Sequence, residues 1–166
     1  MYEKGDYIVY GQHGICRVQD ITNPGFSGMD EHKLYYVLEP LCSTGSKIYS
    51  PVDNEKVLMR RVMSREEVEK LIDGIPQIEA LWIGSEKMRE EQYKAAMLTC
   101  EPVEWVRIIK TLYKRAKDRI DQGKKITATD ERYLKLAEDG LYSELCFVLG
   151  RGKDEMTKYI RSRVEL

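Results

Sequence analysis

The hydrophobic period of this chain changes once, near residue 64, from about two residues to about 3.6. Before that point, short apolar runs alternate with polar residues and are separated by Gly, Pro, Asn, Asp and Ser, which is typical of strands and turns. After it, apolar residues recur three and four positions apart, which is typical of amphipathic helices. The sequence therefore predicts an α+β fold with two parts in series, strands first and helices second.

The strand-like part contains five short segments, at residues 7–10, 15–21, 34–38, 47–52 and 57–62. Strands this short cannot build an open sheet with a large core, so closure into a small β-barrel is the economical arrangement. We expect the barrel to bury six apolar side chains: Ile8, Val18, Tyr36, Leu38, Ile48 and Leu58.

The helical part begins with a capping box, Ser64-Arg65-Glu66-Glu67. Gly74 and Pro76 end the first helix, and residues 75–84 are the expected joint between domains. Further helices are expected from Ser85 to about residue 99, at 102–122, from a cap at Thr127 or Thr129 to Gly150, and at 154–163. The predicted domains are 1–63 (β domain), 64–84 (helix and joint) and 85–166 (an all-α helical bundle).

The composition excludes several classes of protein. Of the 166 residues, 42% are hydrophobic and 33% are charged, as in ordinary soluble globular proteins. No apolar run approaches the roughly 18 residues of a membrane span and no signal-peptide pattern is present, so we expect a cytoplasmic protein with no membrane partner. The four cysteines have no metal-ligand or disulfide spacing and are expected to be reduced packing residues. Without a catalytic motif, we expect no enzyme activity, cofactor, metal or small-molecule substrate.

Charge is unevenly distributed along a chain whose net charge is −1. Residues 107–132 hold nine basic and four acidic residues, whereas residues 65–91 hold four basic and eight acidic ones. On the helix at 102–122, one sector is apolar and the opposite face is cationic. The apolar sector comprises Trp105, Ile109, Leu112, Tyr113, Ala116 and Ile120. The cationic face comprises Arg107, Lys110, Lys114 and Lys117, and Arg119, Lys124, Lys125 and Arg132 extend it. Such a face either contacts the phosphates of a nucleic acid or is simply solvated.

Two features outside that helix also admit two interpretations. Trp82 lies in the expected joint, where it either packs the two domains together or acts as an apolar wedge in a minor groove. The segment at 47–52 contains Pro51, which suits a sheet edge because Pro lacks an amide donor. An edge strand can be an ordinary exposed edge or can pair with a strand of a partner.

A pattern near the N-terminus resembles a known family. The residues Gly5, Asp6, Ile8, Val9, Tyr10, His13 and Gly14 match the signature G-D-x-V-V-Y-x-x-H-G, which resembles the CarD/CdnL family of bacterial transcription regulators. The same module occurs in transcription-repair coupling factors. The resemblance continues at 51–54, at 109–113 and at 141–145. It implies a Tudor-like or SH3-like barrel.

The resemblance also implies partners and contact residues. The β domain would bind the β subunit of RNA polymerase by strand addition, through Lys47, Ile48 and Tyr49. The helical domain would contact promoter DNA at the upstream edge of the transcription bubble and modulate open-complex stability. In the family, a Trp four residues before a Tyr acts as the wedge; here Arg89 holds that position before Tyr93. Trp82, Arg89 and Lys94 are therefore candidate DNA contacts beside the cationic face.

The leading hypothesis is thus a CarD-like regulator, expected to be monomeric, that binds polymerase and DNA through separate domains. The alternative is a protein-interaction adaptor with a β-barrel binding module and a helical docking or dimerisation domain that contacts no nucleic acid. A barrel that binds RNA is a third hypothesis, which the lack of an identifiable aromatic row among basic residues disfavours.

Overall fold

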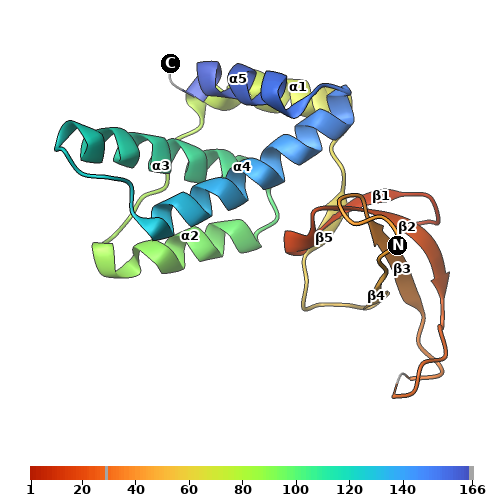
Figure 1. The fold of residues 1–166 in the computed structure, drawn as a ribbon. Coiled ribbons are helices and arrows are strands. Elements are labelled where there is room, and N and C mark those ends of the chain that lie inside the picture. Colours follow the sequence, from red (N-terminus) through yellow and green to blue (C-terminus); the bar gives the residue numbers. More distant parts are fainter. Residues whose placement is uncertain (29, 165–166) are drawn as a thin grey trace. The chain divides into compact units, whose positions relative to one another are not determined.

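The computed structural model describes residues 1–28 and 30–164 and divides the chain into two compact units, Met1–Val62 and Met63–Leu166. The first unit contains the strands and the second contains the long helices (Figure 1). The α+β class and the order of the two parts are confirmed. Residues 64–84, expected to be a helix and a joint, lie in the second unit.

The β unit is a five-stranded antiparallel sheet with the strand order β4-β3-β2-β1-β5. The strands are β1 (Tyr7–Tyr10), β2 (Ile15–Thr22), β3 (Tyr35–Pro40), β4 (Ile48–Pro51) and β5 (Met59–Arg61). A closed barrel would also pair β4 with β5, and the described strands show no such pairing. The Tudor-like or SH3-like identity stays a prediction.

Glycine makes the turn between β1 and β2 possible. A one-turn 3₁₀ helix, Gly11–His13, joins the two strands. Gly11 has a φ of 49°, and a Cβ at this position would lie 2.7 Å from Cγ1 of Val57. The amide of Gly11 donates to the carbonyl oxygen of Leu58. The turn therefore needs a residue without a side chain, because the chain before β5 passes close to it.

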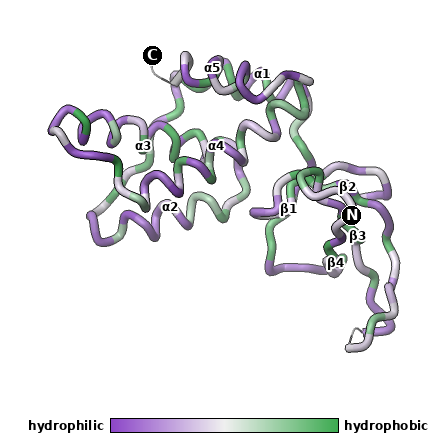
Figure 2. Tube along the Cα trace, viewed as in Figure 1, coloured by the Kyte–Doolittle hydropathy of each residue, from purple (hydrophilic) through white to green (hydrophobic). Residues whose placement is uncertain are grey.

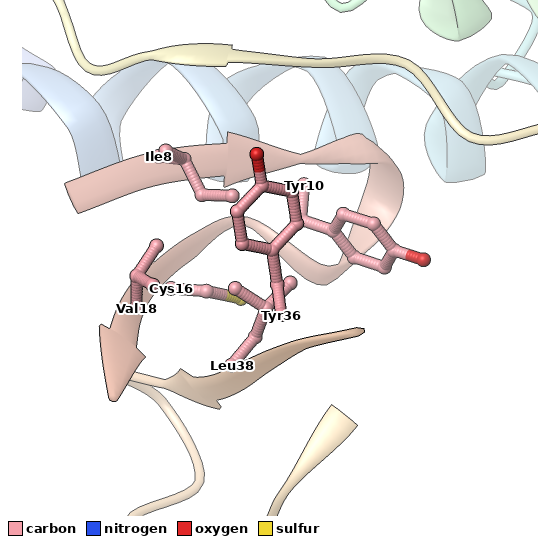
Figure 3. Close-up of a cluster of buried hydrophobic side chains, with 6 residues drawn as sticks. All are labelled: Ile8, Tyr10, Cys16, Val18, Tyr36 and Leu38. Carbon is pink, nitrogen blue, oxygen red and sulfur yellow. The ribbon is translucent and has the colours of Figure 1, made fainter. Parts of the chain in front are cut away.

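Alternate residues of the first three strands build the core of the β unit. Figure 3 shows these six side chains gathered together: Ile8, Tyr10, Cys16, Val18, Tyr36 and Leu38. Burying each large apolar side chain contributes about 1.5–3 kcal/mol relative to exposure. Ile48 packs against this cluster, as does Met59.

The expectation that Leu58 is buried was wrong, because 55% of this residue is exposed. Met59 is the first residue of β5 and packs on the core, and neighbouring residues in an extended chain point to opposite sides. The apolar run 57–59 did not reveal which of its members faces inward.

The helical unit contains α1 (Arg65–Gly74), α2 (Arg89–Leu98), α3 (Pro102–Asp121), α4 (Ala128–Leu149) and α5 (Lys153–Val164). Short 3₁₀ turns lie at Ile75–Gln77 and Glu86–Met88. The capping box at Ser64 and Glu67 is present, and Thr127 caps α4 by accepting the Asp130 amide. The expected helices are therefore confirmed, with Thr127 rather than Thr129 as the cap.

The apolar face of α3 packs mainly against α4, and Figure 2 shows apolar and hydrophilic residues interleaved along both helices. Trp105 is buried as expected, and a Cβ on Gly140 would lie 3.5 Å from its ring. Ile120, expected in the core, is 66% exposed. It lies in the last turn of α3, beside the exposed residues 121–125, so the apolar stripe runs past the packed part of the helix.

All four cysteines are free thiols. Cys16 and Cys100 are buried and Cys146 is half-buried, which fits packing roles. Burial raises the pKa of the Cys16 thiol to about 11. Cys42 is exposed, so the expectation that it packs in a core was wrong; it lies in the loop between β3 and β4. Within the described residues, no cluster of metal-ligating side chains is found, and none of the helices is long and apolar enough to cross a membrane.

Candidate functional site

Five of the predicted DNA-contact residues are cations with exposed side chains. They are Lys94 on α2, Lys114 and Lys117 on α3, and Lys124 and Lys125 in the turn between α3 and α4. Within residues 1–28 and 30–164, none of the five forms an ion pair. These ammonium groups are available to bind an external anion.

Four other predicted DNA contacts are engaged within the helical unit. Arg89 pairs with Glu86 at 2.7 Å and donates to the Tyr93 hydroxyl at 2.8 Å. Arg107 pairs with Glu104 at 2.9 Å, and Arg132 pairs with Glu90 at 2.5 Å. The fourth is Lys110, whose Nζ donates to the main-chain carbonyls of Ile75 and Ile78. The structure thus divides the cationic face into available and engaged side chains.

A charge network that the sequence analysis missed links three helices and a 3₁₀ turn. Arg115 on α3 contacts Asp130 on α4 at 2.6 Å and Glu86 at 3.0 Å. Arg89 at the start of α2 shares Glu86 with it. Hydrogen bonds from Arg89 are the main reason that the pKa of the Glu86 carboxyl falls to about 2. Because Asp130 is almost completely buried, this network organises the unit rather than a ligand.

Trp82 is 79% exposed, so it is not a packed core residue. It lies in residues 78–85, which form neither helix nor strand. Its main-chain carbonyl accepts a hydrogen bond from Gln92 Nε2 at 2.8 Å. The indole ring therefore projects from a segment whose backbone is attached to α2.

The edge of the sheet at β4 presents backbone groups to an incoming strand. The amide of Val52 donates to the Leu34 carbonyl. In this register the main-chain amide and carbonyl groups of alternate residues, Ser50 and Val52, point toward β3. Tyr49 and Pro51 then direct their backbone groups away from the sheet. The missing amide of Pro51 consequently costs no hydrogen bond within the sheet. The prediction that this segment is an edge strand is confirmed.

An open concavity of about 500 Å³ lies on the sheet face that includes Tyr49. Its lining includes three cations, Lys4, Arg17 and Lys47, and one carboxylate, Asp20. Tyr49 also makes an edge-to-face contact with Phe26, with ring centroids 5.1 Å apart. Lys47 is exposed, and Ile48 and Tyr49 are half-buried. This edge therefore combines the outward amide and carbonyl of Tyr49, an aromatic pair and a local excess of positive charge.

Comparison with known families identifies this sheet. Residues 2–63 match the model of the CarD-like/TRCF RID domain, in which RID denotes an RNA polymerase-interacting domain. The β unit is a CarD-like/TRCF RID domain. No curated protein matches the chain.

The match to the RID domain ends at residue 63, so the helical unit lies outside it. The resemblance seen in the first hairpin is thereby confirmed for the β unit. The β4 edge, with Lys47, Ile48 and Tyr49, belongs to the matched region.

Several side chains of potential importance escaped the sequence analysis. Strand alternation could have placed Arg17 on the same sheet face as Tyr49, since both lie opposite the core residues of their strands. Phe26 gave no signal, because it comes from the long loop between β2 and β3. Thr111 and Gln92, which hold the segment that carries Trp82, are polar helix residues without a recognisable motif.

Proposed function

We propose that the chain is a CarD-like transcription regulator that tethers a DNA-contacting helical unit to RNA polymerase. The RID domain binds the polymerase β subunit, and the helical unit contacts promoter DNA near the upstream edge of the transcription bubble, where it modulates the stability of the open complex. The match of residues 2–63 to the CarD-like/TRCF RID domain carries this proposal.

Strand addition at β4 is the proposed mode of polymerase binding. The outward backbone groups of Tyr49 supply a donor and an acceptor, whereas the carbonyl of Pro51 already accepts the amide of Asn54. Lys4, Arg17 and Lys47 line the adjacent concavity, which favours an acidic residue on the incoming strand. Tyr49 and Phe26 offer an aromatic surface for an apolar residue of the same strand.

The five available lysines support contact with DNA phosphates. They are few, and the chain as a whole carries a net charge of −1, so free DNA should be bound weakly. Binding of the RID domain to polymerase makes the second contact intramolecular and raises the effective DNA concentration to the millimolar range for a short link. A DNA contact that is too weak alone then acts only at a promoter that polymerase already occupies.

Two measurements test this function, one of polymerase binding and one of open-complex lifetime. The full chain is immobilised and exposed to purified bacterial RNA polymerase β subunit, and its effect on the lifetime of polymerase–promoter open complexes is measured separately. We expect retention of the β subunit and a changed open-complex lifetime. Retention without any change in lifetime would instead support the adaptor function, in which the helical unit contacts no nucleic acid.

A further inference from the structure

The segment that precedes α2 is fixed by side chains from two helices, although it has no regular secondary structure of its own. Residues 78–85 lie between the 3₁₀ turns at Ile75–Gln77 and Glu86–Met88. Five of the main-chain groups between residues 78 and 84 bond to side chains of α2 or α3. These groups are the carbonyls of Ile78, Glu79 and Trp82 and the amides of Leu81 and Gly84.

Side chains on two adjacent turns of α3 supply part of this attachment. Lys110 Nζ donates to the Ile78 carbonyl at 2.6 Å and also to the Ile75 carbonyl. Thr111 Oγ1 accepts the Leu81 amide at 2.8 Å while donating to the Arg107 carbonyl at 2.7 Å. The hydroxyl of Thr111 therefore uses both its donor and an acceptor position, which fixes its orientation.

Gln92 of α2 attaches the other end of the segment. Its Nε2 donates to the Trp82 carbonyl at 2.8 Å, and its Oε1 accepts the Gly84 amide at 3.2 Å. A single side-chain amide thus fixes the main chain directly after Trp82, on both sides of Ile83. The indole lies over Gly84, where an added Cβ would be 3.1 Å from ring atoms Cζ3 and Cη2. The backbone around Trp82 is held in place while 79% of the residue is exposed.

We propose that Lys110, Thr111 and Gln92 are positioning residues. They hold residues 78–84 as a preorganised segment that presents Trp82 to an unstacked base of the promoter. This inference rests on the proposed function and assigns Lys110 a role different from phosphate contact. A fixed backbone lowers the entropic cost of placing the indole against a base. Exposed aromatic side chains are a common platform for unpaired bases, and most of Trp82 is exposed.

The chemistry of Lys110 supports this assignment. Two of its three ammonium protons are donated to main-chain carbonyls, and the side chain is half-buried. Burial lowers the pKa of Lys110. Lys114 has the same charge and lies one turn away, but it is exposed and has no ion pair among the described residues. The two lysines therefore form a matched pair for a test.

The first measurement determines how ordered residues 78–84 and the Trp82 indole are in the full chain without DNA. The indole N–H of Trp82, assigned by its loss in W82A, is monitored by NMR relaxation together with hydrogen exchange of the Leu81 and Gly84 amides. K110M and T111V should increase indole mobility and accelerate Leu81 exchange, and Q92A should accelerate Gly84 exchange. K114M should change none of these. Wild-type order in both K110M and T111V would overturn the proposal.

The second measurement separates positioning from phosphate contact. Binding of a fluorescein-labelled DNA duplex with an adjoining single-stranded stretch is titrated at several salt concentrations. K114M should lower the slope of log K against log salt by about 0.7–0.9. K110M should weaken binding with an unchanged slope, and it should have no further effect in the W82A background, which alone weakens binding about tenfold. A reduced slope in K110M, or additive effects of K110M and W82A, would overturn the proposal.

The two arms also separate this inference from the function on which it rests. If wild-type protein does not bind the DNA probe and does not alter open complexes, DNA contact fails as a function and the base-binding role of Trp82 fails with it. Loss of order in K110M and T111V, together with a DNA affinity that W82A reduces, supports the full inference. A W82A variant that binds DNA like wild type would overturn the base contact.

Discussion

The two proposed contact surfaces obtain their chemistry in different ways. At β4, the groups that a partner would meet are the main-chain amide and carbonyl of Tyr49, and the register of the sheet determines their direction. On the helical unit, the groups that a partner would meet are cationic side chains. Some of these already bind carboxylates or main-chain carbonyls of the same unit. The direction of a main-chain group at the edge therefore follows from the register, whereas a cation is available only if no internal acceptor binds it.

Consequently, the engaged charges of the helical unit should control stability and the available ones should control binding. Arg115, paired with buried Asp130, represents the first class. Lys114 and Lys117 represent the second.

Removing a buried partner should destabilise the helical unit. Asp130→Ala leaves the largely buried Arg115 without its 2.6 Å partner, and we expect a loss of about 3 kcal/mol in the free energy of unfolding. Urea denaturation of the full chain measures this loss. The RID domain should still bind the β subunit under native conditions. A loss below about 0.5 kcal/mol would show that the pair is not a structural element of the unit.

Reversing two available charges should affect DNA and leave stability unchanged. In Lys114→Glu with Lys117→Glu, the salt slope of DNA binding should fall by at least about 1.4, and the effect on open-complex lifetime should disappear. The free energy of unfolding should change by less than about 0.5 kcal/mol. The control is Lys70→Glu, an exposed lysine of α1 that pairs with Glu66. An equal effect of the control would mean that net charge alone determines binding.

Charge reversal beside the β4 edge should have a moderate effect on polymerase binding. Lys47→Glu places a negative charge in the concavity that Lys4 and Arg17 also line. We expect a slower association with the β subunit, by about threefold to tenfold at low salt, and a difference that shrinks as salt is added. Stopped-flow or surface-based kinetics measure it. An effect confined to dissociation and insensitive to salt would contradict the electrostatic role of this concavity.

The smallest effect is expected from the exposed end of the charge network. Hydrogen bonds from Arg89 lower the pKa of Glu86 to about 2, so its carboxylate stabilises the fold above about pH 4.5, and this contribution is lost as pH falls toward 2. Glu86 is 69% exposed, so Glu86→Gln should cost less than about 1 kcal/mol near neutral pH. The difference from wild type should shrink progressively in unfolding titrations between pH 4.5 and 2. A difference that grows with acidity would contradict the assigned pKa direction.

Features that depend on neighbouring residues in the chain were predictable from the sequence. Strand and helix positions follow from local periodicity and caps, so the capping box at Ser64 and the edge strand with Pro51 were predictable. The apolar sector of α3 was predictable for Trp105 but not for Ile120, because periodicity does not tell where the packing partner ends.

The division of the cationic face could not be predicted. Lys110 and Lys114 are the same residue on nearby turns, yet Lys110 meets carbonyls of the segment after α1 and Lys114 meets solvent. That segment is 32 to 35 positions away in sequence, so only the tertiary fold brings it to Lys110. The same long-range packing creates the contact between Phe26 and Tyr49.

The most direct test of the account is the affinity of the full chain for the polymerase β subunit in two variants at one position. Tyr49→Pro removes the outward amide of β4, whereas Tyr49→Ala removes the ring and keeps that amide. Strand addition predicts that Tyr49→Pro weakens binding at least about tenfold more than Tyr49→Ala, with circular dichroism unchanged. Equal affinities of the two variants would contradict backbone pairing at the β4 edge.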